Sequence, residues 1–282
     1  MAKKIIAVLM SAALLFGLLG VLAGAADKPV CLMLGDSIAY GSGLSNPREA
    51  VYGKIVADTD GFEYLNYAVP GHTTGNLLRR MENETVREGI ARADIVCVSI
   101  GGNNFLLGNL NGLMYDWLVK GDASRFDGLA EDYAADLETI VDTIRGLNPD
   151  AAIVLQTLYN PQTGYVGEVY QQGSDRINAV IRAFDEAHPG EILIADVGAA
   201  LTDKDGDFAE DRIHPSAAGN EKIAQVVLNT LYENGLGGKT EPVIETAGQD
   251  ARGTGGFTLF VNFYGWLFHL LGVITNLFSG LR

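Results

Sequence analysis

Short apolar segments alternate with longer stretches of helical periodicity from residue 30 onward. The apolar segments are Val30–Leu34, Glu63–Tyr67, Asp94–Ile100, Ala151–Leu158 and Glu191–Val197. Three of them (CLML, IVCVSI and AIVLQTL) are almost continuously hydrophobic, which is typical of parallel strands covered by helices on both faces. Helical patterns span Tyr52–Asp58, Glu84–Ala93, Gly128–Gly146, Tyr170–His188 and Ser216–Glu233. This alternation predicts an α/β fold with a parallel sheet and right-handed crossovers.

Glycine-containing loops follow the first three predicted strands, where a parallel sheet of this kind places its ligand site. The first loop carries Ser37 in GDS, the second carries Gly71 in AVPGHTT, and the third carries Asn103 in SIGGNNF. Ser37 is well placed for a nucleophile, although a serine in such a turn needs no function. It is not in a G-x-S-x-G elbow, because Ala39 replaces the second glycine. The sequence also has neither of the common glycine-rich nucleotide motifs.

A serine hydroxyl is a poor nucleophile until a base takes its proton, so the histidines matter. The chain has four: His72, His188, His214 and His269. His188 sits at a predicted helix end, where capping explains it, and His269 lies in the hydrophobic C-terminal segment. His72 could line the site, but His214 has the better context, since Asp211 three residues earlier can accept its Nδ1–H. A solvated loop before the last helix is the alternative interpretation of D-x-x-H-P.

Acyl transfer develops negative charge on the carbonyl oxygen of the substrate, and two of the loops carry suitable donors. A backbone N–H at Gly71 and the side-chain amide of Asn103 can both donate hydrogen bonds to that oxygen. The alternative for GGNN is an ordinary turn, because glycine and asparagine favour left-handed backbone conformations.

Taken together, the loops resemble the SGNH hydrolases, also called GDSL-type lipases and esterases, a family named after its Ser, Gly, Asn and His. GDS at 35–37 and DRIHP at 211–215 match the first and last blocks of the family. NYAVPG at 66–71 matches N-x-G-x-x-G except at Ala68, and GGNN at 101–104 matches G-x-N-D except at Asn104. The blocks occur in the family's order and span residues 30 to about 232.

The resemblance implies roles for five residues. Ser37 would be the nucleophile, His214 the general base and then acid, and Asp211 its orienting partner. The oxyanion hole would consist of the N–H groups of Ser37 and Gly71 and the amide of Asn103. The implied fold is a three-layer α/β/α, flavodoxin-like domain with a five-stranded parallel sheet. Ala68 and Asn104 remove no catalytic group, but they make inference of the substrate less direct.

The ends of the chain differ in composition from this domain. Residues 1–25 combine Lys3 and Lys4, a long apolar run and the A-x-A pattern Ala23-Gly24-Ala25, which predicts a secretory signal peptide. An uncleaved N-terminal anchor is the alternative, because the apolar run is long. The hydrolase domain is expected over 27–234, a flexible glycine-rich linker over 235–256, and a hydrophobic helix over 257–281.

The C-terminal segment contains no Asp, Glu, Lys or Arg, and its small and polar residues recur at spacings of four and three. The members of this stripe are Thr258, Asn262, Gly265, His269, Gly272, Asn276 and Ser279. Three interpretations are open. The helix spans a membrane and packs this stripe on a partner helix, lies in the membrane interface, or docks on its own domain over an apolar groove.

Charge and cysteine content bear on the partners of the protein and on how its fold is stabilised. The net charge of −15 and the absence of a basic cluster argue against nucleic acid. Cys31 and Cys97 are too few for a disulfide framework, and two buried free thiols are expected. No cofactor and no metal ion are expected.

The function predicted from these observations is an exported serine hydrolase of carboxylic acyl esters. A lipid-type ester such as a lysophospholipid is favoured, because the hydrophobic tail would hold the site near a bilayer. A carbohydrate O-acetyl esterase is the alternative substrate class, and a non-catalytic, membrane-tethered binding module is the alternative function. The expected location is extracellular or at the cell surface, in association with the membrane.

Overall fold

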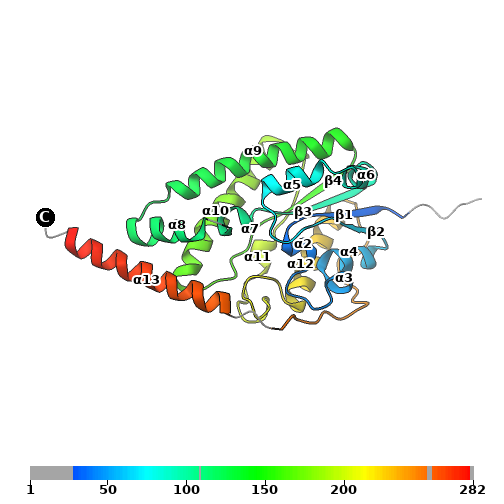
Figure 1. Ribbon diagram of the computed structural model, residues 1–282. Coiled ribbons are helices and arrows are strands. Elements are labelled where there is room, and N and C mark those ends of the chain that lie inside the picture. Colours follow the sequence, from blue (N-terminus) through cyan, green and yellow to red (C-terminus); the bar gives the residue numbers. More distant parts are fainter. Residues whose placement is uncertain (1–27, 108, 253–255, 280–282) are drawn as a thin grey trace, which may run out of the picture.

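The computed structural model describes residues 28–107, 109–252 and 256–279 (Figure 1). The strands are β1 (Val30–Gly35), β2 (Glu63–Asn66), β3 (Ile95–Ser99), β4 (Ala152–Gln156) and β5 (Leu193–Ala195). The helices before β4 are α2 (Ser37–Tyr40), α3 (Pro47–Ala50), α4 (Tyr52–Asp60), α5 (Thr74–Met81), α6 (Glu84–Arg92), α7 (Gly102–Leu106), α8 (Leu110–Tyr115), the π-helical turn η1 (Asp116–Lys120) and α9 (Ser124–Leu147). After β4 come α10 (Gly164–Ala187), α11 (Val197–Ala200), α12 (Ala217–Glu233) and α13 (Gly256–Ser279). The predicted signal peptide, residues 1–25, lies outside the described residues.

The strands form one five-stranded sheet in the order β2-β1-β3-β4-β5, and every neighbouring pair is parallel. This is the flavodoxin-like order that the family resemblance implied, and its parallel pairing is what the alternation of strands and helices predicted. In the register of the two central strands, Gly35 at the end of β1 lies beside Ser99 at the end of β3. The loops after β1, β2 and β3 therefore leave the sheet at the same edge.

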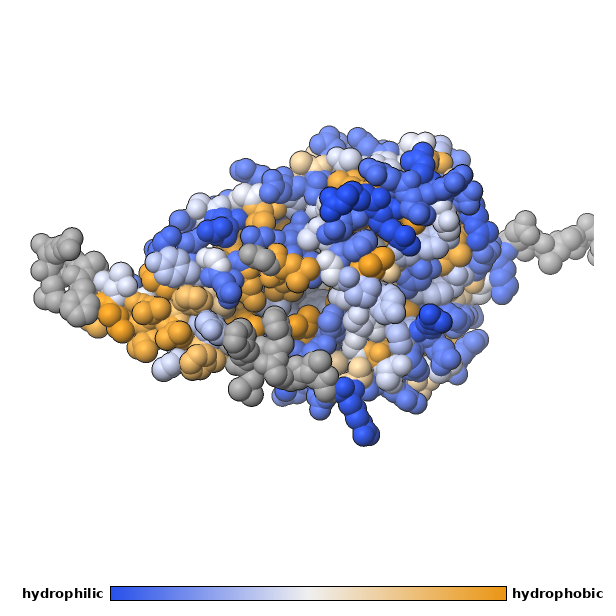
Figure 2. Space-filling model, viewed as in Figure 1, coloured by the Kyte–Doolittle hydropathy of each residue, from blue (hydrophilic) through white to orange (hydrophobic). Residues whose placement is uncertain are grey.

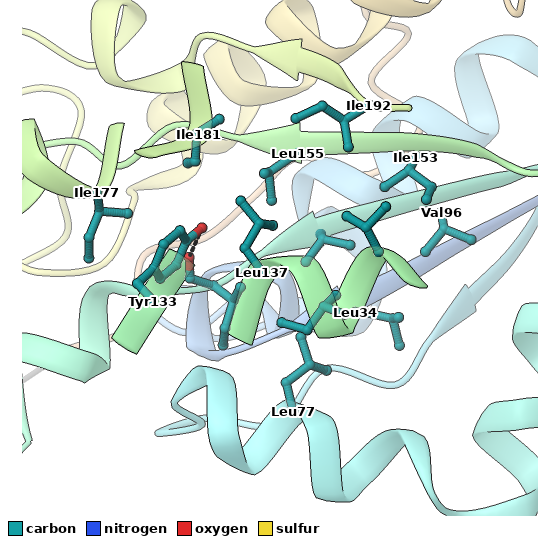
Figure 3. Close-up of a cluster of buried hydrophobic side chains, with 14 of the residues drawn as sticks. Leu34, Leu77, Val96, Tyr133, Leu137, Ile153, Leu155, Ile177, Ile181 and Ile192 are labelled. Atoms are coloured by element: carbon teal, nitrogen blue, oxygen red, sulfur yellow. Dashed lines mark hydrogen bonds between the residues drawn. The ribbon is translucent and has the colours of Figure 1, made fainter. Parts of the chain in front are cut away.

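Alternate residues of the strands belong to two separate apolar cores. Leu32 and Leu34 of β1 pack in a cluster with α5, α6, α9 and α10, part of which is shown in Figure 3. Cys31 and Met33 of the same strand pack in a second cluster, with α4 and α12. Because helices cover both faces, successive residues of β1 and β3 are all buried, which explains their continuous apolar runs. The fold has three layers, α/β/α.

The two cysteines lie on neighbouring strands, are fully buried and are not joined by a disulfide. A hydrogen bond between the thiols, together with burial, raises the pKa of Cys31 well above its usual range. The thiol is therefore neutral at ordinary pH, and the prediction of two free buried thiols is confirmed.

Several helices differ from the predicted ones, mainly at their N-terminal ends. Helix α9 begins at Ser124 instead of Gly128, and α10 begins at Gly164 instead of Tyr170. Helix α5 was not predicted at all. Its start is a capping box, in which the Thr73 hydroxyl accepts from the Asn76 N–H and the Asn76 side chain accepts from the Thr73 N–H. Asparagine in place of the usual Glu or Gln hides this signal in the sequence.

The segment predicted as a flexible linker has an irregular backbone over its described part, 235–252, yet hydrogen bonds hold it against the domain. The N–H of Ser45 donates to the carbonyl of Gln249 at 2.7 Å, and the N–H of Ala251 donates to the carbonyl of Gly43 at 2.8 Å. Farther back, the Val243 N–H donates to the Thr59 hydroxyl oxygen at 2.9 Å. Backbone polar groups need partners wherever they leave water, and α3 and α4 with their flanking loops supply them here.

Helix α13 packs against η1, α8 and α10 of its own domain (Figure 1). Three members of the predicted small-residue stripe make this contact. A Cβ at Gly265 would lie 2.8 Å from Val166 of α10, and a Cβ at Gly272 would overlap the backbone of η1. His269 stacks on Tyr165, with ring centroids 3.9 Å apart. Of the three interpretations of this segment, the structure shows the helix docked on its own domain.

The opposite face of α13 is apolar and exposed, as the orange surface along the helix in Figure 2 shows. Its exposed side chains include Phe263, Trp266, Leu270, Leu271, Val273, Ile274 and Leu277. Among the residues whose placement is described, no helix is both long enough and apolar enough to cross a bilayer.

Candidate active site

Ser37 is held at the end of β1 by a tight turn. Gly35 has a φ of 135°, and a Cβ there would overlap the carbonyl oxygen of Ser99 on β3. Asp36 follows as the N-cap of α2, and its side chain accepts a hydrogen bond from the N–H of Ile38 at 3.0 Å. Ser37 is therefore the first residue of α2, directly beyond the carboxyl end of a central strand.

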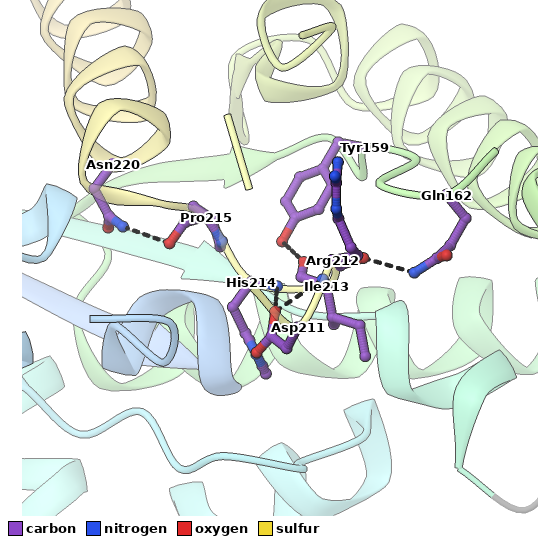
Figure 4. A network of polar contacts seen from close by, with 8 residues as sticks. All are labelled: Tyr159, Gln162, Asp211, Arg212, Ile213, His214, Pro215 and Asn220. Atoms are coloured by element: carbon purple, nitrogen blue, oxygen red, sulfur yellow. Dashed lines mark hydrogen bonds and ion pairs between the residues drawn. The ribbon is translucent and has the colours of Figure 1, made fainter. Parts of the chain in front are cut away.

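His214 and Asp211 form a bonded pair in the loop before α12. Nδ1 of His214 lies 2.7 Å from Oδ2 of Asp211, while the other carboxylate oxygen accepts from the backbone N–H groups of Ile213 and His214 (Figure 4). Burial acts to raise the pKa of Asp211, but the hydrogen bonds and charge of His214 outweigh it and bring that pKa below its usual value. The carboxylate is thus ionised and can orient the imidazole.

Side chains far away in the sequence hold this loop in place. The Tyr159 hydroxyl donates to the carbonyl of Ile213 at 2.9 Å, and the Gln162 amide donates to the carbonyl of Arg212 at 2.6 Å (Figure 4). Arg212 has a φ of 56°, a left-handed conformation that is uncommon outside glycine. Sequence reasoning missed Tyr159 and Gln162, because nothing in their local pattern links them to the DRIHP loop.

The other two loops bring Gly71 and Asn103 to the same region. Gly71 has a φ of 81°, and the space where its Cβ would lie is open apart from Leu107 at 3.9 Å. Asn103 lies in the first turn of α7, and its amide nitrogen donates to the carbonyl of His72 at 2.9 Å. The same amide nitrogen lies 3.5 Å from Oδ2 of Asp36.

Asn104, which departs from the family's G-x-N-D pattern, has a structural contact. Its Oδ1 accepts from the Thr74 N–H at 3.1 Å, and its Nδ2 donates to the Thr74 hydroxyl oxygen at 2.7 Å. The same hydroxyl donates to Asp136 of α9. Asn104 therefore joins the loop after β3 to the start of α5, and an uncharged amide suits a partner that offers both a donor and an acceptor.

A cavity of about 380 Å³ lies at this edge of the sheet, and Ser37, Gly71, Asn103 and His214 all line it. Asp211 stands behind His214. Most of the wall is apolar and comes from Ile38, Phe105, Leu106, Leu107, Leu158, Pro161, Val197 and Ile213. The segment after Asn104 divides between the cavity and the core. Its first residues, in α7, line the cavity, whereas Leu113 and Met114 of α8 are buried in the core.

Asp36 also lines the cavity, and it is a nearly fully buried carboxyl with 3% of its surface exposed. Burial raises its pKa to about 7, although the N–H of Ile38 and the charge of His214 act in the opposite direction. Asp36 therefore loses its proton near neutral pH, far above the usual range of a carboxyl.

The remaining histidines have other surroundings. His188 is the C-cap of α10 and stacks on Phe184, as the capping interpretation expected. His269 is on α13, and His72 contributes its carbonyl but does not line the cavity. Burial and the nearby charges of two arginines lower the pKa of His72. Across the described part of the chain, no group of three or more potential metal ligands is found.

The sequence pattern of the GDSL-like lipase/acylhydrolase family matches residues 33–222, a range that contains all five candidate residues. The chain belongs to this family. It is also similar to the uncharacterized protein YpmR of Bacillus subtilis (strain 168), at 26% identity over 73% of this chain and 83% of that protein. Family membership confirms the interpretation as an enzyme, an esterase or lipase, over that of a non-catalytic binding module.

Solved structures share the fold. The lipase Lip_vut3 from a goat rumen metagenome superposes with a TM-score of 0.60 at 19% identity, over 73% of this chain and 98% of that one. The phospholipase A1 from Streptomyces albidoflavus NA297 superposes with a TM-score of 0.54 at 18% identity, over 73% and 99%. At these identities the similarity establishes the fold of the domain.

Proposed function

We propose that this protein hydrolyses acyl esters through a Ser37–His214–Asp211 triad. The observation that carries the proposal is the 2.7 Å pair of His214 and Asp211 in the wall of the cavity that Ser37 also lines. In the acylation step, His214 takes the proton of the Ser37 hydroxyl while the oxygen attacks the ester carbonyl carbon. The N–H groups of Ser37 and Gly71 and the amide of Asn103 donate to the oxyanion.

The tetrahedral intermediate then collapses, and the alcohol leaves with the proton held by His214. Water attacks the acyl-enzyme in the second half of the reaction, with His214 again accepting a proton. Collapse of the second intermediate releases the carboxylic acid and restores the Ser37 hydroxyl. Asp211 remains ionised throughout and stabilises the imidazolium form of His214 in each half.

We further propose that the acyl group is lipid-like. The aliphatic and aromatic wall of the cavity suits a hydrocarbon chain and offers few partners to sugar hydroxyls. Lipase and phospholipase A1 activities in the names of two structural relatives support the same substrate class. A lysophospholipid is the representative substrate, because its single acyl chain fits one cavity.

The exposed face of α13 supports contact with a lipid surface. It carries large apolar side chains and no charge, whereas Gly265 and Gly272 of the same helix face the domain. Such a helix binds in the membrane interface through apolar area alone, without the lysines that usually attract anionic lipid. We also propose export, directed by residues 1–25, which predicts a mature N-terminus at Ala26.

The test of the chemistry is labelling with a fluorophosphonate followed by peptide mass analysis. The label is expected on Ser37, and Ser37→Ala is expected to be unlabelled and inactive on p-nitrophenyl esters. Labelling elsewhere, or turnover that survives in both Ser37→Ala and His214→Ala, would reject the triad.

The test of substrate class is a series of acetyl, butyryl and octanoyl esters, with lysophosphatidylcholine and acetylated xylose as natural-type substrates. Because each buried methylene contributes about 0.8 kcal/mol, kcat/KM is expected to rise by tenfold or more from acetyl to octanoyl. A preference for acetyl esters and acetylated xylose would instead identify an O-acetyl esterase.

The test of membrane contact is flotation with phosphatidylcholine vesicles. The full-length protein is expected to float, and a Trp266→Glu/Leu270→Glu variant is expected to stay in solution. Tyr232→Glu on α12 is the matched control, since Tyr232 is also exposed but lies on another helix. Equal flotation of all three proteins would contradict a role for α13.

A further inference from the structure

The Asn103 amide nitrogen has two acceptors within the protein, and both select one orientation of the side chain. One is the carbonyl oxygen of His72 at 2.9 Å, and the other is Oδ2 of Asp36 at 3.5 Å. If the amide were flipped, its own oxygen would face two oxygens and would lose both contacts. The terminal torsion of asparagine is broad and roughly two-fold, so these neighbours decide which end of the amide faces them.

Asp36 is itself held in a fixed position. Its N–H donates to the carbonyl of Ser99 at 3.1 Å, and its Oδ1 accepts from the N–H of Ile38 at 3.0 Å. The side chain is buried, and Oδ2 is the oxygen left to face Asn103. The carboxyl therefore connects the turn that carries Ser37 to the loop that carries Asn103, which lie on neighbouring strands β1 and β3.

We propose that Asp36 is a positioning residue that orients the Asn103 amide toward the oxyanion. The proposal rests on the proposed function, in which Asn103 is an oxyanion donor. Asp36 does not touch the reacting atoms. The His72 carbonyl takes one N–H of the amide, and the long 3.5 Å contact with Asp36 keeps the second N–H at the cavity wall, from which it can turn to the oxyanion as negative charge develops on the carbonyl oxygen.

Two other roles for Asp36 are compatible with its location and must be separated from this one. As the N-cap of α2 it stabilises the helix that begins with Ser37, and its charge also acts on His214. Neither of these roles passes through Asn103. Substitutions of Asp36 that keep the N-cap of α2, made with and without replacement of Asn103, therefore distinguish the three roles.

The experiment is a double-mutant cycle with Asp36→Ser and Asn103→Ala, assayed at pH 8, above the Asp36 pKa of about 7. Serine keeps an oxygen that caps Ile38 but is too short to reach Asn103. Asn103→Ala is expected to lower kcat by about 10²-fold, the usual effect of losing one oxyanion donor. Asp36→Ser is expected to lower kcat by about tenfold with KM nearly unchanged, because the contact matters in the transition state.

In the Asn103→Ala background, Asp36→Ser is expected to cost less than about twofold, since the residue through which it acts is gone. Asp36→Asn is the second variant, because it keeps the volume of the side chain. With one oxygen, it cannot accept from both Ile38 and Asn103, so its kcat is also expected to fall. Thermal unfolding is expected to show all variants folded.

The outcomes separate the two proposals. If Asn103→Ala lowers kcat but the Asp36→Ser loss is undiminished in that background, Asp36 acts through the α2 cap or His214, and the positioning role is rejected. Full kcat in both Asp36 variants rejects it as well. If Asn103→Ala itself leaves kcat unchanged, the oxyanion role of Asn103 fails, and the positioning role fails with it.

Discussion

Ser37 and His214 line one cavity but are held there by different kinds of structure. Ser37 follows a buried central strand, and the register of β1 and β3 together with the Gly35 turn determines its place. His214 lies in a loop with no strand of its own, and side chains from elsewhere, including Tyr159, hold the loop by hydrogen bonds to its backbone. The proposed nucleophile thus depends on backbone packing, whereas the proposed base depends on side-chain contacts from a separate part of the chain.

Because of this difference, substitutions near Ser37 and near His214 are expected to have effects of different size. Close backbone packing tolerates almost no added volume, so small substitutions near Ser37 have large effects. A loop held by several hydrogen bonds loses about 1 kcal/mol with each bond, so single changes near His214 have graded effects.

The largest effect tests whether the two halves act as one catalytic unit. Ser37→Ala and His214→Ala are each expected to lower kcat by about 10⁴-fold or more, and the double variant by no more than either alone. Asp211→Ala is expected to cost less, because the imidazole remains present but is no longer oriented. The measurement is steady-state hydrolysis of a p-nitrophenyl ester. Losses that simply multiply in the double variant would show that the residues act independently.

The next effect concerns the backbone packing beneath Ser37. Gly35→Ala is expected to destabilise the fold by about 3 kcal/mol or more, because its Cβ would overlap the Ser99 carbonyl between two core strands. Gly121→Ala is the matched control, since Gly121 also has a positive φ but open space around it. There, only backbone strain remains, about 1 kcal/mol. Urea unfolding measures both, and equal losses would show that the close approach to β3 is unimportant.

The buried carboxyl of Asp36 is expected to make the stability of the protein depend on pH. Burial raises its folded-state pKa to about 7, above the 3.8 of an aspartate in an unfolded chain, so the folded state favours the protonated carboxyl. Its stabilising contribution is complete below pH 4 and is lost as the pH rises through about 7, by at most ~4 kcal/mol. Asp36→Asn removes this titration. Between pH 4 and pH 8 the wild type should therefore lose unfolding free energy relative to Asp36→Asn. A difference between the two proteins that stays constant with pH would contradict burial as the cause.

The smallest effect tests the support of the His214 loop. Tyr159→Phe removes the hydrogen bond to the Ile213 carbonyl while keeping the ring, and is expected to cost about 1 kcal/mol of stability. A several-fold loss of kcat is also expected, because the imidazole is held less firmly. Tyr232→Phe serves as the control, since Tyr232 is exposed on α12. Unchanged kcat in Tyr159→Phe would show that the Asp211 pair alone orients His214.

The strands and the order of the loops could be predicted from the sequence because both depend on patterns among residues close together in the chain. A strand buried on both faces needs successive apolar residues, and Ser37, Gly71, Asn103 and His214 each lie in a short block with a recognisable spacing. Helix α5 was missed because its cap uses Asn76 in place of the common Glu or Gln. The polar composition of 235–252 predicts a flexible linker and does not reveal that its backbone finds partners on α4 and in the loop before α3.

By itself, the sequence determined the α/β alternation, the family and the five candidate residues. Only the tertiary structure decided that Tyr159 supports the His214 loop, that Asp36 is buried beside Asn103, and that α13 turns its two inner glycines toward its own domain. The physical reason is the range of the interactions. Periodicity and turn chemistry act between near neighbours in the chain, whereas burial, pKa and the choice of a packing partner depend on surfaces that meet only after folding.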